Sequence, residues 1–390
     1  MSSQILFNKK IIILLPSFIL GGAERQAVIL GHYLQTICHA RVLLYSLSQS
    51  KGGLEGYCKK FSLPCRVNEN RSRSITSKIL NTIRYGKARA YGAIINDIYK
   101  EEPQILISFV LRANQVAVCI QKYIDVKLTI WNQRDEGFGF SPPQSLIDLA
   151  SNVSYFFTNS AGGQKFLIEA LKVNASKISI SPNLLIKERP TISRIEWRKL
   201  YYVPLSSFCV VMVANLHNRK DHRTLFHAWK RIIEDQGLKE QPILILAGHL
   251  DNQADELVKL ANQLGIYSSV RFIGQQLDIQ NVYQSCDLCV FSSNSEGMPN
   301  GVIEAMLYGL PIVATDIPSI RNSVGDHNRQ WLFTSGQADE LAKKISHFIN
   351  NRDEGVALGR ANEKFAEDNY DFLNSGRKYA AKLMELYERK

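Results

Sequence analysis

The sequence lacks the features that mark disulfide-stabilised and membrane-spanning proteins. Its 390 residues include seven cysteines, an odd number at scattered positions: Cys38, Cys58, Cys65, Cys119, Cys209, Cys286 and Cys289. Unpaired cysteines are typical of a reducing compartment. After the first apolar stretch, no segment approaches the ~20 apolar residues that a membrane-spanning helix needs. At this length we expect two domains, because a single core stops growing at roughly 250–300 residues.

The sequence also offers little evidence for a metal site made of cysteines. Cys286 and Cys289 form a CxxC spacing, CDLC, which would suit zinc or redox chemistry. No second pair and no histidine cluster accompanies this spacing, and it lies in an apolar run typical of a strand. We therefore interpret both cysteines as core residues.

The first apolar stretch, Lys9–Arg25, allows two interpretations. Its sequence KKIIILLPSFILGGAER begins like a secretory signal peptide, with Gly21-Gly22-Ala23 as a small-residue cleavage site. It also matches a buried parallel strand that runs into a glycine turn, whose backbone amides would approach an anion. Because Pro16 interrupts the stretch and export would oxidise the cysteines, the sequence favours the strand and a cytoplasmic protein.

Short apolar runs alternate with longer amphipathic stretches along the whole chain, as in IIILLP, ILISFV, CVVMVAN, ILILAGH and LCVFSS. This alternation predicts an α/β fold with doubly wound parallel sheets. Because Ile11–Leu34 and Cys209–Ile232 begin alike, we expect two Rossmann-like domains that face a cleft. The predicted boundaries are 1–185 for the N-terminal domain, 186–205 for a linker, 206–370 for the C-terminal domain and 371–390 for a helix that packs back on the N-terminal domain.

The net charge of +11 is concentrated in one window. Residues 51–100 hold eleven lysines and arginines against three acids, which gives 11 − 3 = +8. A basic face of this kind can bind nucleic acid, anionic lipid or an anionic substrate, or it can simply be solvated.

Two glutamates in the segment Ser292–Thr315 indicate the chemistry. A strand ends before this segment, Glu296 lies in the following loop, and Glu304 lies one turn into the next helix, so both carboxylates can face one cleft. Carboxylates accept hydrogen bonds from sugar hydroxyls, and the amides of Gly297–Gly301 lie at the positive end of the helix dipole, where phosphate is favoured. The set suits a sugar attached to a nucleoside diphosphate. The same spacing also fits a loop glutamate followed by an exposed helical glutamate.

The segment SEGMPNGVIEAMLYGLPIVATDIPSI resembles the glutamate–seven–glutamate motif of the retaining nucleotide-sugar glycosyltransferases of family four, which have the GT-B fold. Further stretches are similar to the same family in the same order: GGAER, FTNSAGGQKFLIEAL, KISISPN, VANLHNRKDHRTLFHAW and FIGQQLDIQNVYQSCDLCVFSSNSEG. The resemblance implies transfer of a hexose or N-acetylhexosamine from a nucleoside diphosphate, which we expect to be UDP. We expect no cofactor and no protein-held metal, since the chain has no Asp-x-Asp sequence.

The resemblance also implies roles for individual residues. Glu296 would bind the donor sugar and Lys220 its diphosphate, and these two are the predicted catalytic residues. Glu304 would accept hydrogen bonds from the ribose. The other predicted donor contacts are Gly22, Asn215, Arg219, Gly297, Met298, Pro299 and Asn300.

Two of these positions depart from the family. Asn215 stands where the family usually has arginine, and Arg219 could supply that charge; alternatively, Arg219 and Lys220 are exposed loop cations. Pro299 has no N–H, so the Asn300 side chain could replace one backbone donor.

The first domain lacks the histidine that many members place near the acceptor. The sequence WNQRDEGF instead resembles the loop of members that add sugars to polyprenyl-linked oligosaccharides. Arg134 could hold an acceptor phosphate, and Asp135 or Glu136 could act as a base; alternatively, Arg134 and Asp135 form a local ion pair. SFVLRAN resembles the same subgroup and adds Arg112 and Asn114 as predicted acceptor contacts.

The sequence therefore predicts a retaining glycosyltransferase that acts on a glycan or a polyprenyl-diphosphate-linked acceptor in cell-surface polysaccharide synthesis. Because such acceptors stay at the membrane, we expect peripheral contact with the anionic inner face of the cell membrane, through cations that include Lys78, Arg84, Lys87 and Arg89. The alternatives are a nucleoside-diphosphate-sugar epimerase and a basic nucleic-acid-binding protein, and we expect no nucleic-acid partner.

Overall fold

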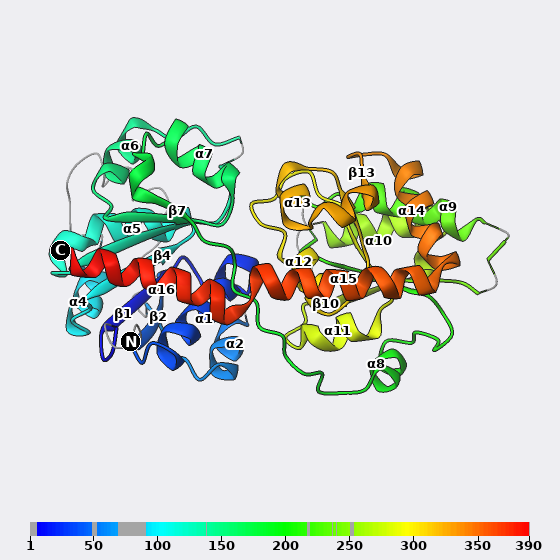
Figure 1. The fold of residues 1–390 in the computed structure, drawn as a ribbon, viewed down its shortest axis with the longest axis horizontal. Helices are drawn as coiled ribbons and strands as arrows, with labels where there is room; N and C mark the ends of the chain where they lie inside the picture. Colours follow the sequence, from blue (N-terminus) through cyan, green and yellow to red (C-terminus); the bar gives the residue numbers. More distant parts are fainter. Residues whose placement is uncertain are drawn as a thin grey trace. The chain divides into compact units, whose positions relative to one another are not determined.

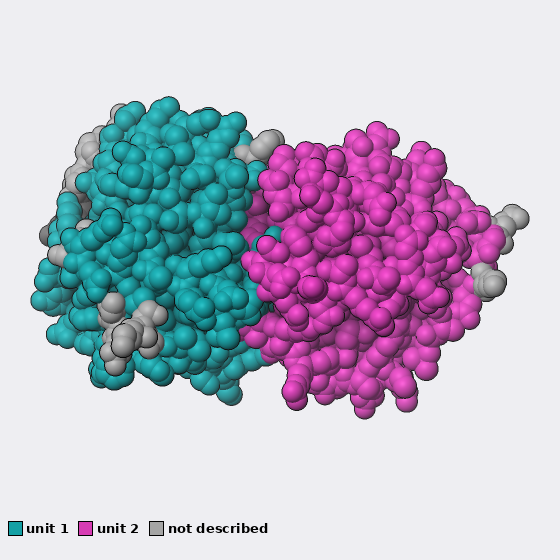
Figure 2. Space-filling view, in the orientation of Figure 1, with its two compact units in different colours: residues 1–185, 370–390 teal, residues 186–369 magenta. Residues whose placement is uncertain are grey.

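The computed structural model divides the chain into two compact units (Figures 1 and 2). Unit 1 comprises Met1–Leu185 and Tyr370–Lys390, and unit 2 comprises Ile186–Asn369. The structure describes residues 6–48, 53–68, 91–137, 139–216, 219–235, 237–238, 240–249 and 253–389.

Unit 1 contains a parallel sheet of seven strands in the order β3-β2-β1-β4-β5-β6-β7. Each strand is a short, mostly buried run, which is what a sheet covered on both faces requires. The strands are β1 (Lys10–Leu15), β2 (Arg41–Ser46), β3 (Cys65–Val67), β4 (Ile105–Phe109), β5 (Leu128–Gln133), β6 (Tyr155–Thr158) and β7 (Ile178–Ile180).

Helices cover both faces of this sheet (Figure 1). Alternate residues of a strand point to opposite faces, so Ile12 contributes to the core beneath α4 and α5, while Ile13 lies against Gly31 of α1. On the α1 face, Tyr379 of α16 stacks on Phe157 at 4.0 Å between ring centroids. The helices are α1 (Gly22–Thr36), α2 (Leu54–Lys60), α4 (Gly92–Lys100), α5 (Leu111–Ile120), α6 (Gln144–Ser151), α7 (Ala161–Glu169) and α16 (Phe372–Glu388).

Unit 2 contains a parallel sheet of six strands in the order β10-β9-β8-β11-β12-β13. The strands are β8 (Cys209–Val213), β9 (Ile243–Ala247), β10 (Val270–Gly274), β11 (Leu288–Phe291), β12 (Ile312–Thr315) and β13 (Leu332–Phe333). The helices are α8 (Arg194–Leu200), α9 (His222–Ile233), α10 (Ala254–Gln263), α11 (Ile279–Ser285), α12 (Asn300–Leu307), α13 (Pro318–Ser323), α14 (Ala338–Asn350) and α15 (Arg352–Tyr370).

The prediction of an α/β fold with two Rossmann-like doubly wound sheets is confirmed. In each unit the strand order reverses beside the first strand, between β1 and β4 in unit 1 and between β8 and β11 in unit 2. Open parallel sheets bind ligands at such a reversal, beyond the carboxyl ends of the strands. The fold therefore indicates one candidate site edge in each unit.

The stretch 186–205 lies in unit 2 and contains helix α8. Ser193 and Glu196 form a capping box at its N-terminus, each side chain accepting a hydrogen bond from the other's backbone N–H. Arg198 is fully buried and donates to Asp287 Oδ2 at 2.8 Å and to the Ser285 carbonyl oxygen at 2.9 Å. These bonds attach α8 to the end of α11 and the start of β11.

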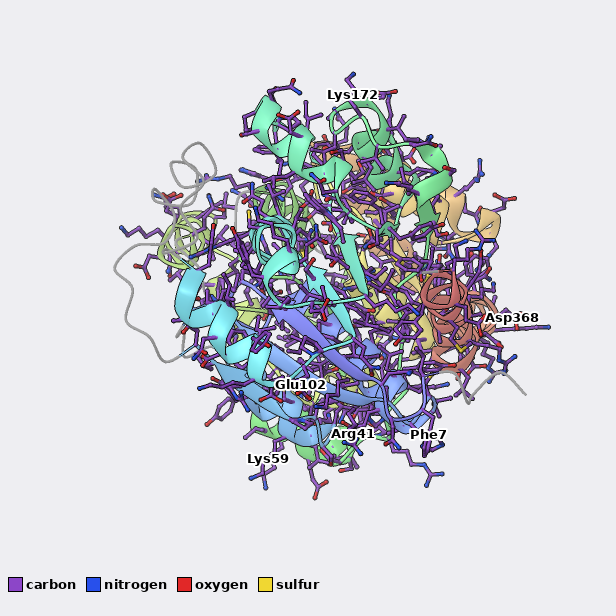
Figure 3. All side chains as sticks on the ribbon, turned by 90° about the vertical axis from the view of Figure 1, so that its left-hand side faces the viewer. Phe7, Arg41, Lys59, Glu102, Lys172 and Asp368 are labelled. Carbon is purple, nitrogen blue, oxygen red and sulfur yellow. The ribbon has the colours of Figure 1, made fainter. Side chains whose placement is uncertain are left out.

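The basic window can be followed only in part. Lys78, Arg84, Lys87 and Arg89 lie outside the described residues. Figure 3 shows other charged side chains at the surface of unit 1, with Lys59 and Lys172 at opposite edges. Within the described ranges, no helix is both long and apolar enough to cross a membrane.

Candidate functional site

The reversal point of unit 2 is built from two loops that run side by side. The loop after β8 reaches α9 through Arg219, Lys220 and Asp221, and the loop after β11 begins with Ser292 and Ser293. Asp221 N–H donates to the Ser292 carbonyl at 3.0 Å, and Ser292 Oγ donates to the Asp221 carbonyl at 2.8 Å. An antiparallel bridge joins Lys220 to Ser293. The backbone thus fixes the two loops to each other.

This pairing brings the two predicted catalytic residues into contact. Lys220 Nζ forms a short ion pair with Glu296 Oε1, and Ser293 Oγ donates to the same oxygen at 2.5 Å. The ammonium group also lies 4.5 Å from the ring centroid of Phe291. The side chains are only 14% and 12% exposed, so water screens this pair less than it screens a surface pair. Lys220 is therefore not an exposed loop cation.

Asn215 and Arg219, which lie on the same loop as Lys220, make other contacts. Asn215 Oδ1 accepts the backbone N–H of His249 at 3.1 Å, which ties the end of β8 to the end of β9. Arg219 is exposed, and its carbonyl oxygen accepts the Asn294 N–H at 2.9 Å. The Asn215 side chain thus holds two strand ends together, and Arg219 lies next to Lys220 in the loop.

Helix α12 starts close to the end of β8. A Cβ atom on Gly301 would lie 2.5 Å from the Val213 carbonyl oxygen, so only glycine permits this approach. The approach puts the first turn of α12, with its positive dipole end, at the reversal point. The Asn300 N–H donates to the Met298 carbonyl at 3.0 Å and is therefore engaged within the loop that holds Gly297, Met298 and Pro299.

Glu304 is almost completely buried, at 7% exposure, and Tyr283 of α11 lies against it. Tyr283 Oη is 3.3 Å from Glu304 Oε2 and 3.1 Å from the Gly301 carbonyl oxygen. Because one hydroxyl carries one hydrogen, these two acceptors share it. Burial, with the nearby Glu304 carboxylate, raises the pKa of the Cys289 thiol. Glu304 is therefore a core-facing carboxylate rather than an exposed helical one.

Tyr283 is itself held by a second tyrosine. Its ring stacks on Tyr308 at 5.5 Å with 16° between the planes. Tyr308 Oη accepts the Glu188 N–H at 3.0 Å and lies 3.3 Å from the Glu188 carbonyl oxygen. The sequence analysis missed Tyr283, Tyr308 and Ser293. Ser293 adjoins the quoted motif and Tyr308 lies within it, but nothing in the spacing marks either of them or Tyr283.

In unit 1 the glycine turn after β1 leads into α1, as the sequence predicted. Gly21 is the N-cap, and α1 begins at Gly22. A Cβ atom on Gly21 would lie 2.5 Å from Glu24 Oε2, so a carboxylate of the chain lies at this helix end. Burial raises the pKa of Glu24. Gly22 therefore lies in unit 1, whereas the other predicted donor residues lie in unit 2.

Arg134 lies just beyond the end of β5 and has only neutral partners among the described residues. Nη1 donates to Asn183 Oδ1 at 2.9 Å, and Nη2 donates to Asn132 Oδ1 at 3.1 Å. The guanidinium lies 4.7 Å from the Phe109 ring centroid, and burial lowers the pKa of Arg134 to about 10. Tyr379 of α16 donates to the same Asn132 oxygen at 3.2 Å.

The alternative interpretation, a local ion pair between Arg134 and Asp135, does not hold among the described residues. Asp135 Oδ1 instead accepts the Gln133 side-chain amide at 2.8 Å and the Gly137 N–H at 2.9 Å. Glu136 lies against the first turn of α7, where a Cβ atom on Gly162 would meet its Oε1 at 2.2 Å. Both acids are thus engaged in shaping the loop.

The other reversal strand of unit 1 ends in a strained residue. Val110 has φ +71° and ψ 143°, a conformation that a β-branched residue rarely adopts. It is the N-cap of α5, which carries Arg112 and Asn114 in its first turn. Asn114 is fully buried, and its side-chain amide donates to the Asn132 carbonyl at 3.2 Å, which attaches α5 to β5. Arg112 is half-buried.

The described part of the chain contains no group of three or more histidine, cysteine, aspartate or glutamate side chains arranged to hold a metal ion. The CxxC cysteines do not pair with each other. Cys286 Sγ instead lies 3.5 Å from Cys209 Sγ, with both residues buried in the core of unit 2.

Comparison with known proteins finds relatives that are named glycosyltransferases. Residues 193–365 match the model of the family described as glycosyl transferases group 1. An uncharacterized glycosyltransferase of Haemophilus influenzae is 28% identical over 168 residues, which cover 42% of this chain and 46% of the relative. A UDP-Gal:alpha-D-GlcNAc-diphosphoundecaprenol alpha-1,3-galactosyltransferase of Escherichia coli is 27% identical over 157 residues, 40% of each chain. The chain thus spans less than half the length of these relatives.

A solved structure shares the whole fold. The crystal structure of Anabaena HepE in complex with UDP and glucose superposes with a TM-score of 0.80 and 20% identity, covering 97% of this chain and 100% of that one. This likeness confirms the two-domain fold.

The partly buried contact between Lys220 and Glu296 should couple their contributions to stability. We expect Lys220→Met and Glu296→Gln each to destabilise the protein, and a double-mutant cycle to give a coupling free energy of about 1–3 kcal/mol. Urea unfolding of the four proteins measures it. The same cycle on the exposed pair Arg223–Glu256, each 60% exposed, should give roughly 0–1 kcal/mol. Equal coupling free energies in the two pairs would show that the contact between Lys220 and Glu296 stabilises the protein no more than an exposed ion pair does.

Proposed function

We propose that this protein is a retaining glycosyltransferase that uses a UDP-linked hexose or N-acetylhexosamine. The observation that carries the proposal is the contact between Lys220 and Glu296 beside the first turn of α12, at the strand reversal of unit 2. A cation, a carboxylate and a helix N-terminus at one point suit a diphosphate joined to a sugar. The names of the relatives support this proposal, and none of those reported above is an epimerase.

Binding of the donor would break the ion pair between Lys220 and Glu296 and give each side chain a new partner. The diphosphate would take the Lys220 ammonium, and Glu296, released from its ion pair, would accept hydrogen bonds from sugar hydroxyls. Ser293 donates to Glu296 and would hold that carboxylate in place after the exchange. Glu304 would accept the ribose hydroxyls, with its orientation set by Tyr283.

Transfer would then need no protein nucleophile. The bond between the anomeric carbon and the diphosphate oxygen breaks, and Lys220 with the α12 amides stabilises the negative charge that grows on the leaving oxygen. The acceptor hydroxyl attacks from the same face and gives its proton to the departing phosphate. This route retains the anomeric configuration and requires no general base, which agrees with the engagement of Asp135 and Glu136 in their own loop.

Arg134 supports an anionic acceptor, such as a polyprenyl-diphosphate-linked glycan. A half-buried guanidinium whose partners are the amide oxygens of Asn132 and Asn183 retains its full charge, so an entering phosphate would gain a strong contact. The strained Val110 and the half-buried Arg112 lie at the end of the neighbouring β4. The Escherichia coli relative is named for a diphosphoundecaprenol acceptor, which agrees with this proposal. Membrane contact through residues 78–89 remains a prediction from the sequence.

Replacing Glu304 tests the donor site. Glu304→Gln should weaken UDP binding roughly 10- to 150-fold, because hydrogen bonds to a charged group contribute about 1.5–3 kcal/mol. Tyr283→Phe should shift the affinity in the same direction by less. Titration calorimetry with UDP gives both values, and Glu256→Gln, an exposed carboxylate on α10, is the matched control. Unchanged UDP affinity in a folded Glu304→Gln protein would refute the ribose role.

Replacing Lys220 or Glu296 tests the chemical step. Lys220→Met and Glu296→Gln should each raise the activation free energy for release of UDP from a UDP-sugar by about 2–4 kcal/mol. Each change should weaken the binding of the donor by a smaller free energy. UDP release can be followed with water as the acceptor, so the natural acceptor is not needed. Arg223→Met, which removes an exposed cation three residues along, should behave as wild type. Normal turnover in both variants would refute the proposed function.

Replacing Arg134 tests the acceptor class. With a lipid-diphosphate-linked N-acetylglucosamine as the probe acceptor, Arg134→Gln should raise the acceptor KM about tenfold or more, since a charge-assisted bond is lost. Arg134→Lys should restore part of the loss, and UDP affinity should stay constant. Lys172→Gln, an exposed cation of the same unit, is the control (Figure 3). An unchanged acceptor KM in Arg134→Gln would show that Arg134 only supports the fold.

A further inference from the structure

The most exposed large apolar side chains of the described residues gather in one short segment. Ile195, Leu200, Tyr202 and Leu205 are 62%, 61%, 82% and 61% exposed, and no other large apolar side chain in the described ranges exceeds 60%. We call these four residues the α8 surface. Single exposed apolar residues are normal, whereas large apolar patches are typical of interaction sites.

Helix α8 has no need of these residues for its own packing. Its inner face is filled by Trp197 and Arg198, which are 2% and 0% exposed, and the Trp197 ring contacts Tyr201 at 4.6 Å. Ile195 and Leu200 flank the outer side of the helix, which carries Glu196 and Lys199. The helix therefore buries an arginine beside the tryptophan and leaves two aliphatic side chains exposed, which is unusual for a surface helix.

Tyr202 is held in a backbone conformation that favours glycine. Its φ is +54°, and it occupies the residue after the C-cap of α8. Val203 N–H donates to the Arg198 carbonyl at 2.8 Å and Tyr202 N–H donates to the Lys199 carbonyl at 3.2 Å, which is the Schellman pattern. A tyrosine there costs stability that glycine would not cost, although its ring is 82% exposed. Packing of the Tyr202 ring therefore does not offset this cost.

Cations without acidic partners surround the α8 surface. Lys199 lies on the exposed side of α8; Arg271 donates to the carbonyl oxygens of Ser268 and Tyr202, at 2.8 and 3.4 Å. Arg352 donates to the Ser206 carbonyl at 3.2 Å. Among the described residues, none of these three cations is within ion-pair distance of a carboxylate, so their charge remains uncompensated. Glu196, the acid of α8, accepts the Ser193 backbone N–H in the capping box.

We propose that the α8 surface docks on an anionic lipid bilayer. The aliphatic side chains would enter the acyl boundary, the Tyr202 ring would lie at the headgroup level, and the three cations would meet anionic headgroups. A second copy of the chain fits less well, because a two-fold contact would bring the same uncompensated cations together. This surface belongs to unit 2 and does not involve residues 78–89. It does not depend on the proposed function.

Vesicle flotation of the full-length protein tests the proposal. Wild type should bind vesicles of phosphatidylcholine with phosphatidylglycerol more tightly than phosphatidylcholine alone, and less tightly in high salt. Tyr202→Gly combined with Leu205→Ser should lower binding at least about tenfold, because apolar burial is lost. Lys199→Gln with Arg271→Gln should remove the preference for anionic vesicles. Phe7→Ser with Ile180→Ser, which changes two exposed apolar residues of unit 1, should bind as wild type.

A single variant separates docking from folding. Tyr202→Gly relieves the backbone strain, so its melting temperature should equal or exceed that of wild type while its vesicle binding falls. Equal vesicle binding by wild type and Tyr202→Gly/Leu205→Ser would overturn the proposal. Loss of binding only when Lys78, Arg84, Lys87 and Arg89 become Gln would also overturn it. So would self-association in sedimentation that Tyr202→Gly/Leu205→Ser abolishes without any vesicle binding by wild type.

Discussion

The site in unit 2 depends on one constraint, the close approach of helix α12 to the end of β8. Gly301 permits this approach because any side chain there would collide with the Val213 carbonyl oxygen. The approach sets the first turn of α12 at the strand reversal, and the loop that precedes it then runs beside Lys220. Glu296 meets Lys220 because both lie on loops that the hydrogen bonds between Asp221 and Ser292 hold together. The chemistry of the site thus follows from backbone packing.

Much of this site could be predicted from the sequence because its parts follow strands. A residue just after a parallel strand lies at the carboxyl edge of the sheet, so Lys220 and Glu296 could be placed at one edge before their contact was known. The contact of Tyr283 with Glu304 could not be predicted in this way. Tyr283 lies in α11, a short and largely buried helix with the sequence IQNVYQS, and only the packing of α11 brings its hydroxyl to α12. Sequence spacing says nothing about such contacts between helices.

The same reasoning explains the stretch 186–205 and the loop after β5. The apolar periodicity lapses in α8 because Trp197 and Arg198 fill its inner face, although the capping-box residues Ser193 and Glu196 do mark its start. Asp135 had the spacing of a local partner for Arg134, but the Asp135 carboxylate binds the amides of Gln133 and Gly137. Short polar loops offer several partners of equal sequence distance, and backbone geometry decides among them.

The two units compensate their central cations in different ways, and this difference bears on how each site would use its ligand. Lys220 has a carboxylate partner in the chain, so under the proposed function a diphosphate would compete with Glu296, and part of the gain on binding would be lost in breaking that pair. Among the residues that the structure describes, Arg134 has only amide oxygens as hydrogen-bond partners, and burial has already lowered its pKa, so the folded unit bears the unfavourable free energy of a poorly compensated charge. An anion that enters beside Arg134 would relieve that free energy instead of displacing a partner. An anion should therefore bind tightly beside Arg134 even if it makes few contacts. The Lys220 site should instead favour a ligand that replaces Glu296 as the partner of the ammonium group and also binds the released Glu296 carboxylate.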